Sequence, residues 1–176
     1  EARALQHLFF AERACAKGPG VDAKGAAPLD AVGVVGGGTM GRGIAMCFLD
    51  AGLPVTLVDV DDTAAAAAAA GIDATYRRSS AFRKGRLTEA ALAAKLAKLA
   101  VASDVAALGG ADLVVEAIYE DLEAKRDVFA RLDGACKPTA VLASNTSTLS
   151  IDRIADAVAD PARVVGTCVE INQCVG

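Results

Sequence analysis

A glycine-rich turn that follows a short apolar segment constrains this fold more than any other feature of the sequence. Residues 31–35 (AVGVV) suit a strand buried in a parallel sheet, and residues 40–51 read as a helix closed by Gly52. Between them, the run Gly36-Gly37-Gly38-Thr39-Met40-Gly41 matches the pattern G-x-G-x-x-G. This order of strand, turn and helix predicts a turn that binds a dinucleotide.

The glycines of the motif have separate physical roles. Gly36 permits the tight turn, Gly38 lets the backbone approach a pyrophosphate, and Gly41 allows the helix to pack closely. The N–H groups at the helix N-terminus, where Thr39 and Met40 lie, attract phosphate oxygens. We therefore expect residues 36–41 to bind the phosphates of a cofactor.

A second apolar run, residues 55–58, ends at Asp59, which lies 21 positions after Gly38. That spacing is close to the roughly 20 residues expected for the carboxylate that binds the ribose 2′-hydroxyl. A carboxylate there would repel a 2′-phosphate, so NAD is favoured over NADP. The alternative is a structural turn followed by a helix-capping aspartate.

The alternation of strands and helices continues along the chain. Further strands are expected at 99–102, 113–116, 141–144 and 164–167, and helices at 61–82, 88–98, 122–132 and 151–158, with Asp61, Thr88 and Ser150 as candidate caps. The pattern predicts an α/β fold built on a doubly wound parallel sheet. We expect a leading helix and linker over residues 1–28 and the dinucleotide-binding domain over residues 29–176.

Composition excludes several classes of protein. The 176 residues have a formal net charge of −4 and 4% aromatic residues, which argues against a nucleic-acid surface. No run of about 18 uncharged apolar residues occurs, so no membrane span is expected. The start lacks the layout of a signal peptide, and the five cysteines are scattered. These features predict a protein that is not secreted and works in a reducing compartment, without a metal site.

Three segments of the chain resemble the L-3-hydroxyacyl-CoA dehydrogenases of fatty-acid β-oxidation. They are residues 32–45 (VGVVGGGTMGRGIA), residues 113–125 (LVVEAIYEDLEAK) and residues 142–151 (LASNTSTLSI), and they occur in the family's order. Residues 2–13 (ARALQHLFFAER) are similar to the connector between hydratase and dehydrogenase parts in the multifunctional β-oxidation proteins. The resemblance implies a Rossmann-type domain, NAD as cofactor and an acyl-CoA substrate.

The resemblance also implies roles for individual residues. Ser147 occupies the position of the serine that hydrogen-bonds the reacting oxygen near the nicotinamide, and its alternative role is that of an ordinary turn hydroxyl. Glu116, Ala117 and Ile118 occupy the segment that lines the nicotinamide ribose, and Glu116 alternatively is a plain carboxylate at a strand end. A basic cluster over residues 77–86 could bind CoA phosphates, but a solvated helix end is the favoured interpretation.

The chain departs from the family pattern after the sixth strand. The family places its catalytic histidine in Gly-x-His-Phe-Phe, whereas this sequence reads Gly166-Thr167-Cys168 at that point, and its one histidine is His7. Losing a general base typically costs about 10²- to 10⁴-fold in rate. We therefore expect a cofactor-binding half of such a dehydrogenase, truncated or divergent after its sixth strand and inactive alone.

Two other functions stay open at this stage. The chain could be a non-catalytic NAD(H)-binding module in which Cys168 is original, or, more weakly, part of a related sugar-acid dehydrogenase. In the favoured interpretation, a complete parent protein binds the acyl-CoA substrate, in the cytoplasm of a bacterium or in a peroxisome. An uncovered end of the sheet would also favour a homo-oligomer.

Overall fold

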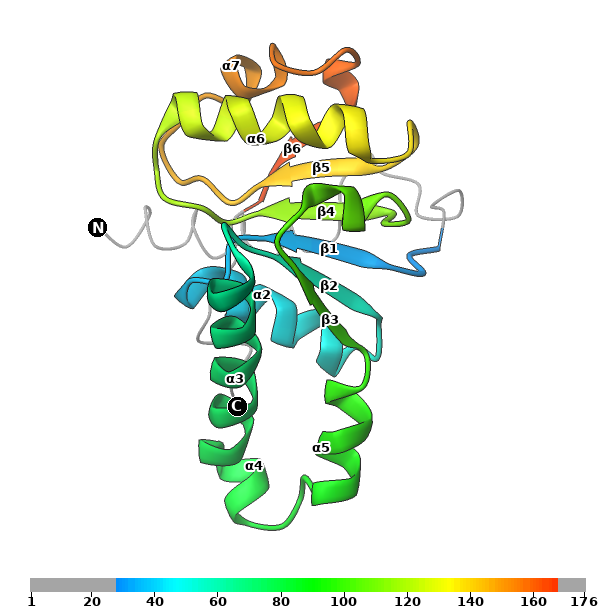
Figure 1. Ribbon diagram of the computed structural model, residues 1–176, viewed down its shortest axis with the longest axis vertical. Coiled ribbons are helices and arrows are strands. Elements are labelled where there is room, and N and C mark those ends of the chain that lie inside the picture. The colour runs from blue at the N-terminus through cyan, green and yellow to red at the C-terminus, as the bar shows by residue number, and fades with distance from the viewer. Residues whose placement is uncertain (1–27, 168–176) are drawn as a thin grey trace, which may run out of the picture.

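The computed structural model describes residues 28–167, which form one parallel sheet with helices on both faces (Figure 1). The strands are β1 (Val32–Val35), β2 (Val55–Val58), β3 (Leu99–Ala102), β4 (Leu113–Glu116), β5 (Val141–Ser144) and β6 (Val164–Gly166). All the paired strands run parallel. The predicted α/β class and doubly wound sheet are therefore confirmed.

The strand order β3-β2-β1-β4-β5-β6 places the first strand in the middle of the sheet. The chain moves outward from β1 to β2 and β3, then crosses back so that β4 pairs with the other side of β1. Val35 at the end of β1 is aligned with Val58 on one side and with Glu116 on the other. The carboxyl ends of these three strands therefore meet where the winding reverses, which is where doubly wound sheets bind ligands.

The helices follow the predicted order, with two short 3-10 helices between them. They are α2 (Thr39–Asp50), α3 (Asp62–Arg78), α4 (Ser80–Arg83), α5 (Glu89–Leu96), η2 (Val105–Leu108), α6 (Leu122–Ala135), α7 (Ile151–Ala155) and η3 (Pro161–Arg163). Three predicted caps are confirmed, since Asp61, Thr88 and Ser150 each accept a hydrogen bond from a backbone N–H of the first turn that follows. Within residues 28–167, no helix is long and apolar enough to cross a membrane.

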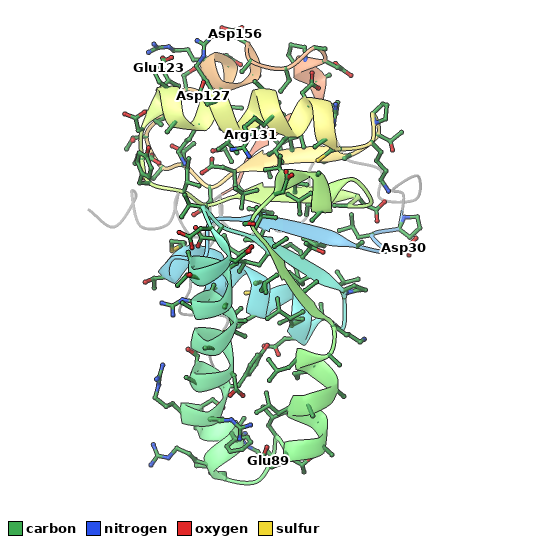
Figure 2. All side chains as sticks on the ribbon, viewed as in Figure 1. Asp30, Glu89, Glu123, Asp127, Arg131 and Asp156 are labelled. Carbon is green, nitrogen blue, oxygen red and sulfur yellow. The ribbon has the colours of Figure 1, made fainter. Side chains whose placement is uncertain are left out.

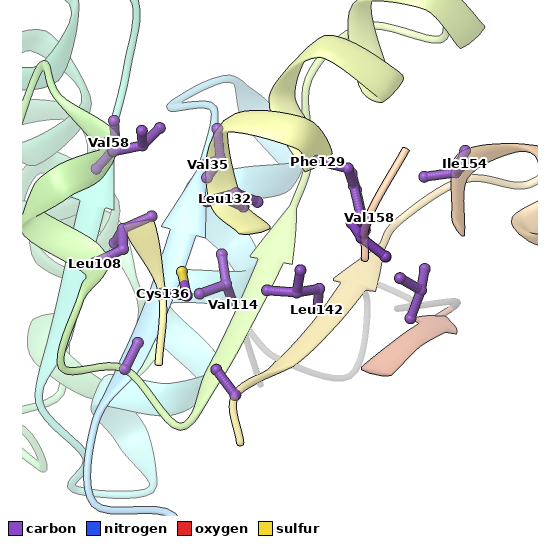
Figure 3. Packing of buried hydrophobic residues seen from close by; sticks show 14 of the residues in the cluster. Val35, Val58, Leu108, Val114, Phe129, Leu132, Cys136, Leu142, Ile154 and Val158 are labelled. Atoms are coloured by element: carbon purple, nitrogen blue, oxygen red, sulfur yellow. The ribbon is translucent and has the colours of Figure 1, made fainter. Parts of the chain in front are cut away.

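Alternating residues of the strands send their side chains into two separate cores. Val34 and Val115 join the core beneath α2, α3 and α5, whereas Val35 and Val114 join the core beneath α6, α7 and η2. Figure 3 shows the second core, in which Phe129 of α6 packs among strand residues. Because both faces are buried, the strands read as continuous apolar runs rather than alternating ones.

The predicted helix at 61–82 is wrong in one respect, because it is two helices. The backbone of Ser79 is extended, and its hydroxyl accepts the N–H of Phe82, so α3 ends at Arg78 and α4 begins at Ser80. Figure 1 shows α3 running away from the sheet, α4 at the far end and α5 returning. The predicted helices at 88–98 and 151–158 end earlier, at Leu96 and Ala155.

Several predictions concern residues that the structure does not describe. The leading helix and most of the linker, including His7, lie outside residues 28–167. Cys168, at the position of the family's histidine, lies outside them as well.

Candidate cofactor site

At two positions of the turn after β1, the backbone itself leaves no room for a side chain. Gly36 has a φ of +100°, which L side chains rarely adopt, and its N–H donates to the carbonyl of Val58 at 2.8 Å. A Cβ on Gly36 would lie 2.8 Å from the carbonyl oxygen of Ala117. A Cβ on Gly41 would lie 1.7 Å from the carbonyl oxygen of Gly36. Gly36 and Gly41 therefore serve the shape of the turn.

Gly38 has the opposite environment, because a Cβ added there would meet nothing within 4 Å. Gly38 is also the N-cap residue of α2, and no side chain caps that helix. The exposed N-terminus of a twelve-residue helix thus begins beside open space, with Thr39 first and Met40 second. Free N–H groups and the positive end of the helix dipole favour an anion here, so the turn fits a pyrophosphate.

Asp59 lies directly beside this turn, as the sequence spacing predicts. Its Oδ2 accepts the N–H of Gly37 at 2.8 Å, and its Oδ1 accepts the N–H of Val60 at 2.7 Å. A Cβ on Gly37 would lie 2.5 Å from Cβ of Ala68 in α3 and 2.6 Å from Oδ2 of Asp59, so a side chain there would displace the helix or the carboxylate. Gly37 therefore keeps Asp59 close to the glycine turn.

A cavity of about 630 Å³ opens between the glycine turn, the end of β2, the segment after β4 and one face of α6. Val60 and Tyr119 line it with exposed fractions of 83% and 71%, so apolar surface faces solvent at its rim. Arg131 also lines it, and Figure 2 shows this side chain on the side of α6 that faces the sheet. Nothing in the residue patterns indicated Tyr119 or Arg131, because their placement depends on α6 lying over β1 and β4.

A second cavity of about 360 Å³ lies on the other side of Ala117 and Ile118, which line both cavities. The residues that complete it are Met40, Glu120, Asn145, Thr146 and Ser147. The loop after β5 and the start of α2 are thus brought together across the ends of the strands. Ser147 is exposed, and no residue of the described range accepts or donates a hydrogen bond at its hydroxyl. That hydroxyl is available to a ligand.

Glu116, expected to line the cofactor segment, is fully buried and lines neither cavity. Its Oε1 lies 2.7 Å from Nζ of the buried Lys125 and also accepts the N–H of Ile118 at 2.7 Å. Its Oε2 accepts the hydroxyl of Ser144 at 2.6 Å. Glu116 therefore ties together β4, β5 and α6 from beneath the site.

Glu120 also lines the second cavity, although no residue pattern pointed to it. One of its oxygens, Oε1, accepts bonds from the hydroxyls of Thr146 and Thr148 and from the N–H groups of Ser147 and Thr148. The hydrogen bond from Thr146 is the main reason that the pKa of Glu120 lies below its ordinary value. Its other oxygen lies 3.5 Å from Nζ of Lys125. Glu120 thus fixes the loop that presents Ser147.

The basic cluster on α3 and α4 is partly committed to structural contacts. Arg77 pairs with Asp73 at 2.9 Å and with Glu89 at 2.7 Å, and its guanidinium lies over the ring of Phe82. These contacts connect α3 to α4 and α5. They agree with the favoured interpretation of a solvated helix end, at least for this arginine.

Known proteins are similar to this chain in sequence. Residues 31–168 match the family described as 3-hydroxyacyl-CoA dehydrogenase, NAD binding domain. The human peroxisomal bifunctional enzyme is 40% identical over 172 residues, and the alpha subunit of the fatty acid oxidation complex of Vibrio cholerae is 35% identical over 167 residues. These matches cover 95% and 94% of the chain, but only 23% of either relative.

Solved structures of 3-hydroxybutyryl-CoA dehydrogenases are also similar to this chain. The 3-hydroxybutyryl-CoA dehydrogenase of Escherichia coli is 39% identical with a TM-score of 0.74, covering 80% of this chain and 29% of that one. The (S)-3-hydroxybutyryl-CoA dehydrogenase of Ralstonia eutropha is 33% identical with a TM-score of 0.77, covering 81% and 50%. The chain belongs to the 3-hydroxyacyl-CoA dehydrogenase family, as a domain of its NAD-binding type.

Proposed function

We propose that this chain provides the NAD site for the oxidation of L-3-hydroxyacyl-CoA to 3-oxoacyl-CoA in fatty-acid β-oxidation. One observation supports this most directly: Ser147 and the start of α2 line a single cavity beside the dinucleotide turn. A hydroxyl that is free to bind an oxygen thus lies next to a surface built for phosphates. The activity belongs to the whole protein, of which this domain matches about a quarter in its curated relatives.

In this proposal, residues that line both cavities would hold the cofactor. The N–H groups at the start of α2 hold the pyrophosphate, and Asp59 accepts a ribose hydroxyl on one side. Ala117, Ile118 and Asn145 line the nicotinamide side, where Ser147 binds the substrate oxygen. NAD⁺, when held by these residues, would supply the hydride acceptor for the carbon that carries the hydroxyl. Glu116 acts from below, by fixing the ends of β4 and β5.

The proton of the substrate hydroxyl needs an acceptor, which in the family is a histidine. Residues 28–167 contain no histidine, since the one histidine of the sequence is His7. The family's position for the base is Cys168. We therefore propose that the chain binds NAD without turning over 3-hydroxyacyl-CoA by itself. The same cysteine is the basis of the alternative, in which the chain is a non-catalytic NAD(H)-binding module.

Two chimeras with the Escherichia coli 3-hydroxybutyryl-CoA dehydrogenase test the proposal. In the first, residues 28–167 replace the matching segment, so the host keeps its own histidine. In the second, residues 28–168 replace it, so Cys168 is the one added difference. We expect the first chimera to produce NADH from 3-hydroxybutyryl-CoA and the second to be about 10²- to 10⁴-fold slower. A folded first chimera that binds NADH without turnover would contradict the proposal and favour the non-catalytic module.

The setting of the protein is proposed on the same grounds. Acyl-CoA is the substrate of the complete protein. The compartment is a peroxisome, which the name of the human relative includes, or the cytoplasm of a bacterium, since another relative is bacterial. Residues 29–176 form the proposed domain unit. Among residues 28–167, β6 is an edge strand of the sheet and Val165 is exposed on it, which supports self-association of the chain. Sedimentation as a monomer at high protein concentration would contradict that last point.

A further inference from the structure

We propose that Glu120 shifts the affinity of this site toward the oxidised nicotinamide, whose ring is positively charged, relative to the neutral reduced form. The inference rests on the proposed function, because it needs the nicotinamide in the cavity that Ser147 and Met40 line. It adds a property that NAD binding alone does not imply, namely a bias between the two forms of the cofactor.

Glu120 is the one charged side chain among the seven residues that line this cavity. Its side chain keeps 37% of its surface exposed, so the carboxylate reaches the open side of the site. The hydrogen bonds from Thr146 and Thr148 keep the pKa of this carboxyl low, so it is ionised near neutral pH. A negative charge therefore faces whatever occupies the cavity.

The neighbouring lysine does not neutralise this charge. Nζ of Lys125 lies 2.7 Å from Glu116 but 3.5 Å from Glu120, so its closer partner is the carboxylate beneath the site. The three groups together hold two negative charges and one positive charge. Because Glu116 and Lys125 have no exposed side-chain surface, the excess negative charge lies on the group that faces the cavity.

The carboxylate is also held in place before any ligand arrives. Its Oε1 accepts hydrogen bonds from the loop on either side of Ser147. The carboxylate therefore keeps the same position whether the neutral ring of NADH or the charged ring of NAD⁺ is bound. The positive end of α2 acts on the phosphates, which are the same in both forms of the cofactor, so it cannot create the bias.

The difference between the two forms isolates the electrostatic effect. A residue that only supports the loop changes the affinities for NAD⁺ and NADH by the same factor. A charge near the ring changes their ratio, since only NAD⁺ has the ring charge. For unit charges several ångströms apart in a well-solvated site, Coulomb's law gives a change of about three- to tenfold.

The test measures dissociation constants of NAD⁺ and NADH for the unaltered chain, Glu120→Gln and Glu123→Gln, by calorimetric titration at low and high salt. Glu123 is an exposed carboxylate in the first turn of α6 that lines neither cavity, so it is the matched control. We expect Glu120→Gln to raise the ratio Kd(NAD⁺)/Kd(NADH) about three- to tenfold. Glu123→Gln should leave the ratio unchanged.

Three results would overturn the inference, and they are distinguishable. Equal weakening of both forms by Glu120→Gln would reduce Glu120 to a loop support and leave the proposed function intact. Binding of neither form by the unaltered chain would remove the proposed function itself. If Glu120→Gln does not fold, the salt dependence of the unaltered chain decides, because screening must raise its ratio. A ratio that is independent of salt would then contradict the inference.

Discussion

Oδ2 of Asp59 accepts the backbone N–H of Gly37 at 2.8 Å, which joins the end of β2 to the turn after β1. The carboxylate therefore lies beside the surface that approaches the cofactor phosphates, and it lines the larger cavity. This contact places a negative charge where the 2′-position of the adenosine ribose is proposed to lie.

Asp59→Asn tests whether this charge selects NADH over NADPH. The amide keeps the size of the side chain but removes its repulsion of a 2′-phosphate, so the ratio of the two affinities should fall about tenfold or more. Asp62→Asn is the matched control, because Asp62 is exposed in the first turn of α3 and has no contact with Gly37. Titration with both cofactors measures the ratio. An unchanged ratio in Asp59→Asn would remove Asp59 from selection.

Two alanine substitutions separate the folding and binding roles of the glycine turn. Gly38→Ala should leave the melting temperature nearly unchanged and weaken NADH binding, because its Cβ enters open space at the phosphate site. Gly41→Ala should lower the melting temperature sharply, because its Cβ would collide with the carbonyl of Gly36. Thermal unfolding and NADH titration distinguish the two. Tight NADH binding by a folded Gly38→Ala would contradict the placement of the pyrophosphate.

Lys125→Met is expected to destabilise the fold by about 3–5 kcal/mol, because it leaves the carboxylate of Glu116 buried without its cation. Lys95→Met is the control, since the partly exposed pair of Lys95 and Asp50 should contribute about 1 kcal/mol or less. Urea unfolding measures both. The double variant Glu116→Gln with Lys125→Met should recover part of the loss. A cost for Lys125→Met no larger than for the control would contradict the buried pair as a structural requirement.

Acid should weaken the anchorage of the segment that enters β1. The carboxylate of Asp112 accepts hydrogen bonds from Nζ of Lys137 and from the N–H groups of Asp30 and Ala31. These bonds lower the pKa of Asp112 from the ordinary 3.8 to about 2. Because the folded pKa is the lower one, the stabilisation is complete above pH 3.8 and is lost as the pH falls toward 2. Asp112→Asn should be less stable near neutrality and show a flatter pH dependence in this window. Equal slopes for the two proteins would contradict this contribution.

Much of the site could be predicted because its signals are local. The turn at 36–41 and the carboxylate at Asp59 belong to one strand–helix–strand unit, so glycine spacing and strand length suffice. The direction of Glu116 follows the strand period, since it shares a face with Val114, beneath α6. It therefore points to Lys125 rather than into the cofactor cavity.

The remaining features depend on tertiary packing. The break at Ser79 comes nine residues after the alanine run at 64–70, where the hydroxyl of Ser79 accepts the N–H of Phe82 and starts a new helix. Glu120 and Thr146 come from different loops, which meet because β4 and β5 pair in register. Arg131 reaches its cavity because α6 covers the sheet at that point. None of these relationships has a fixed spacing in the sequence.

Titration of the unaltered chain with NADH and then with NADPH tests the central claim most directly. We expect micromolar affinity for NADH and an affinity for NADPH that is weaker by about tenfold or more, as a carboxylate at Asp59 requires. Competition by ADP-ribose would locate the binding at the glycine turn. No binding of either cofactor, or equal binding of both, would contradict an NAD site formed by the glycine turn and Asp59.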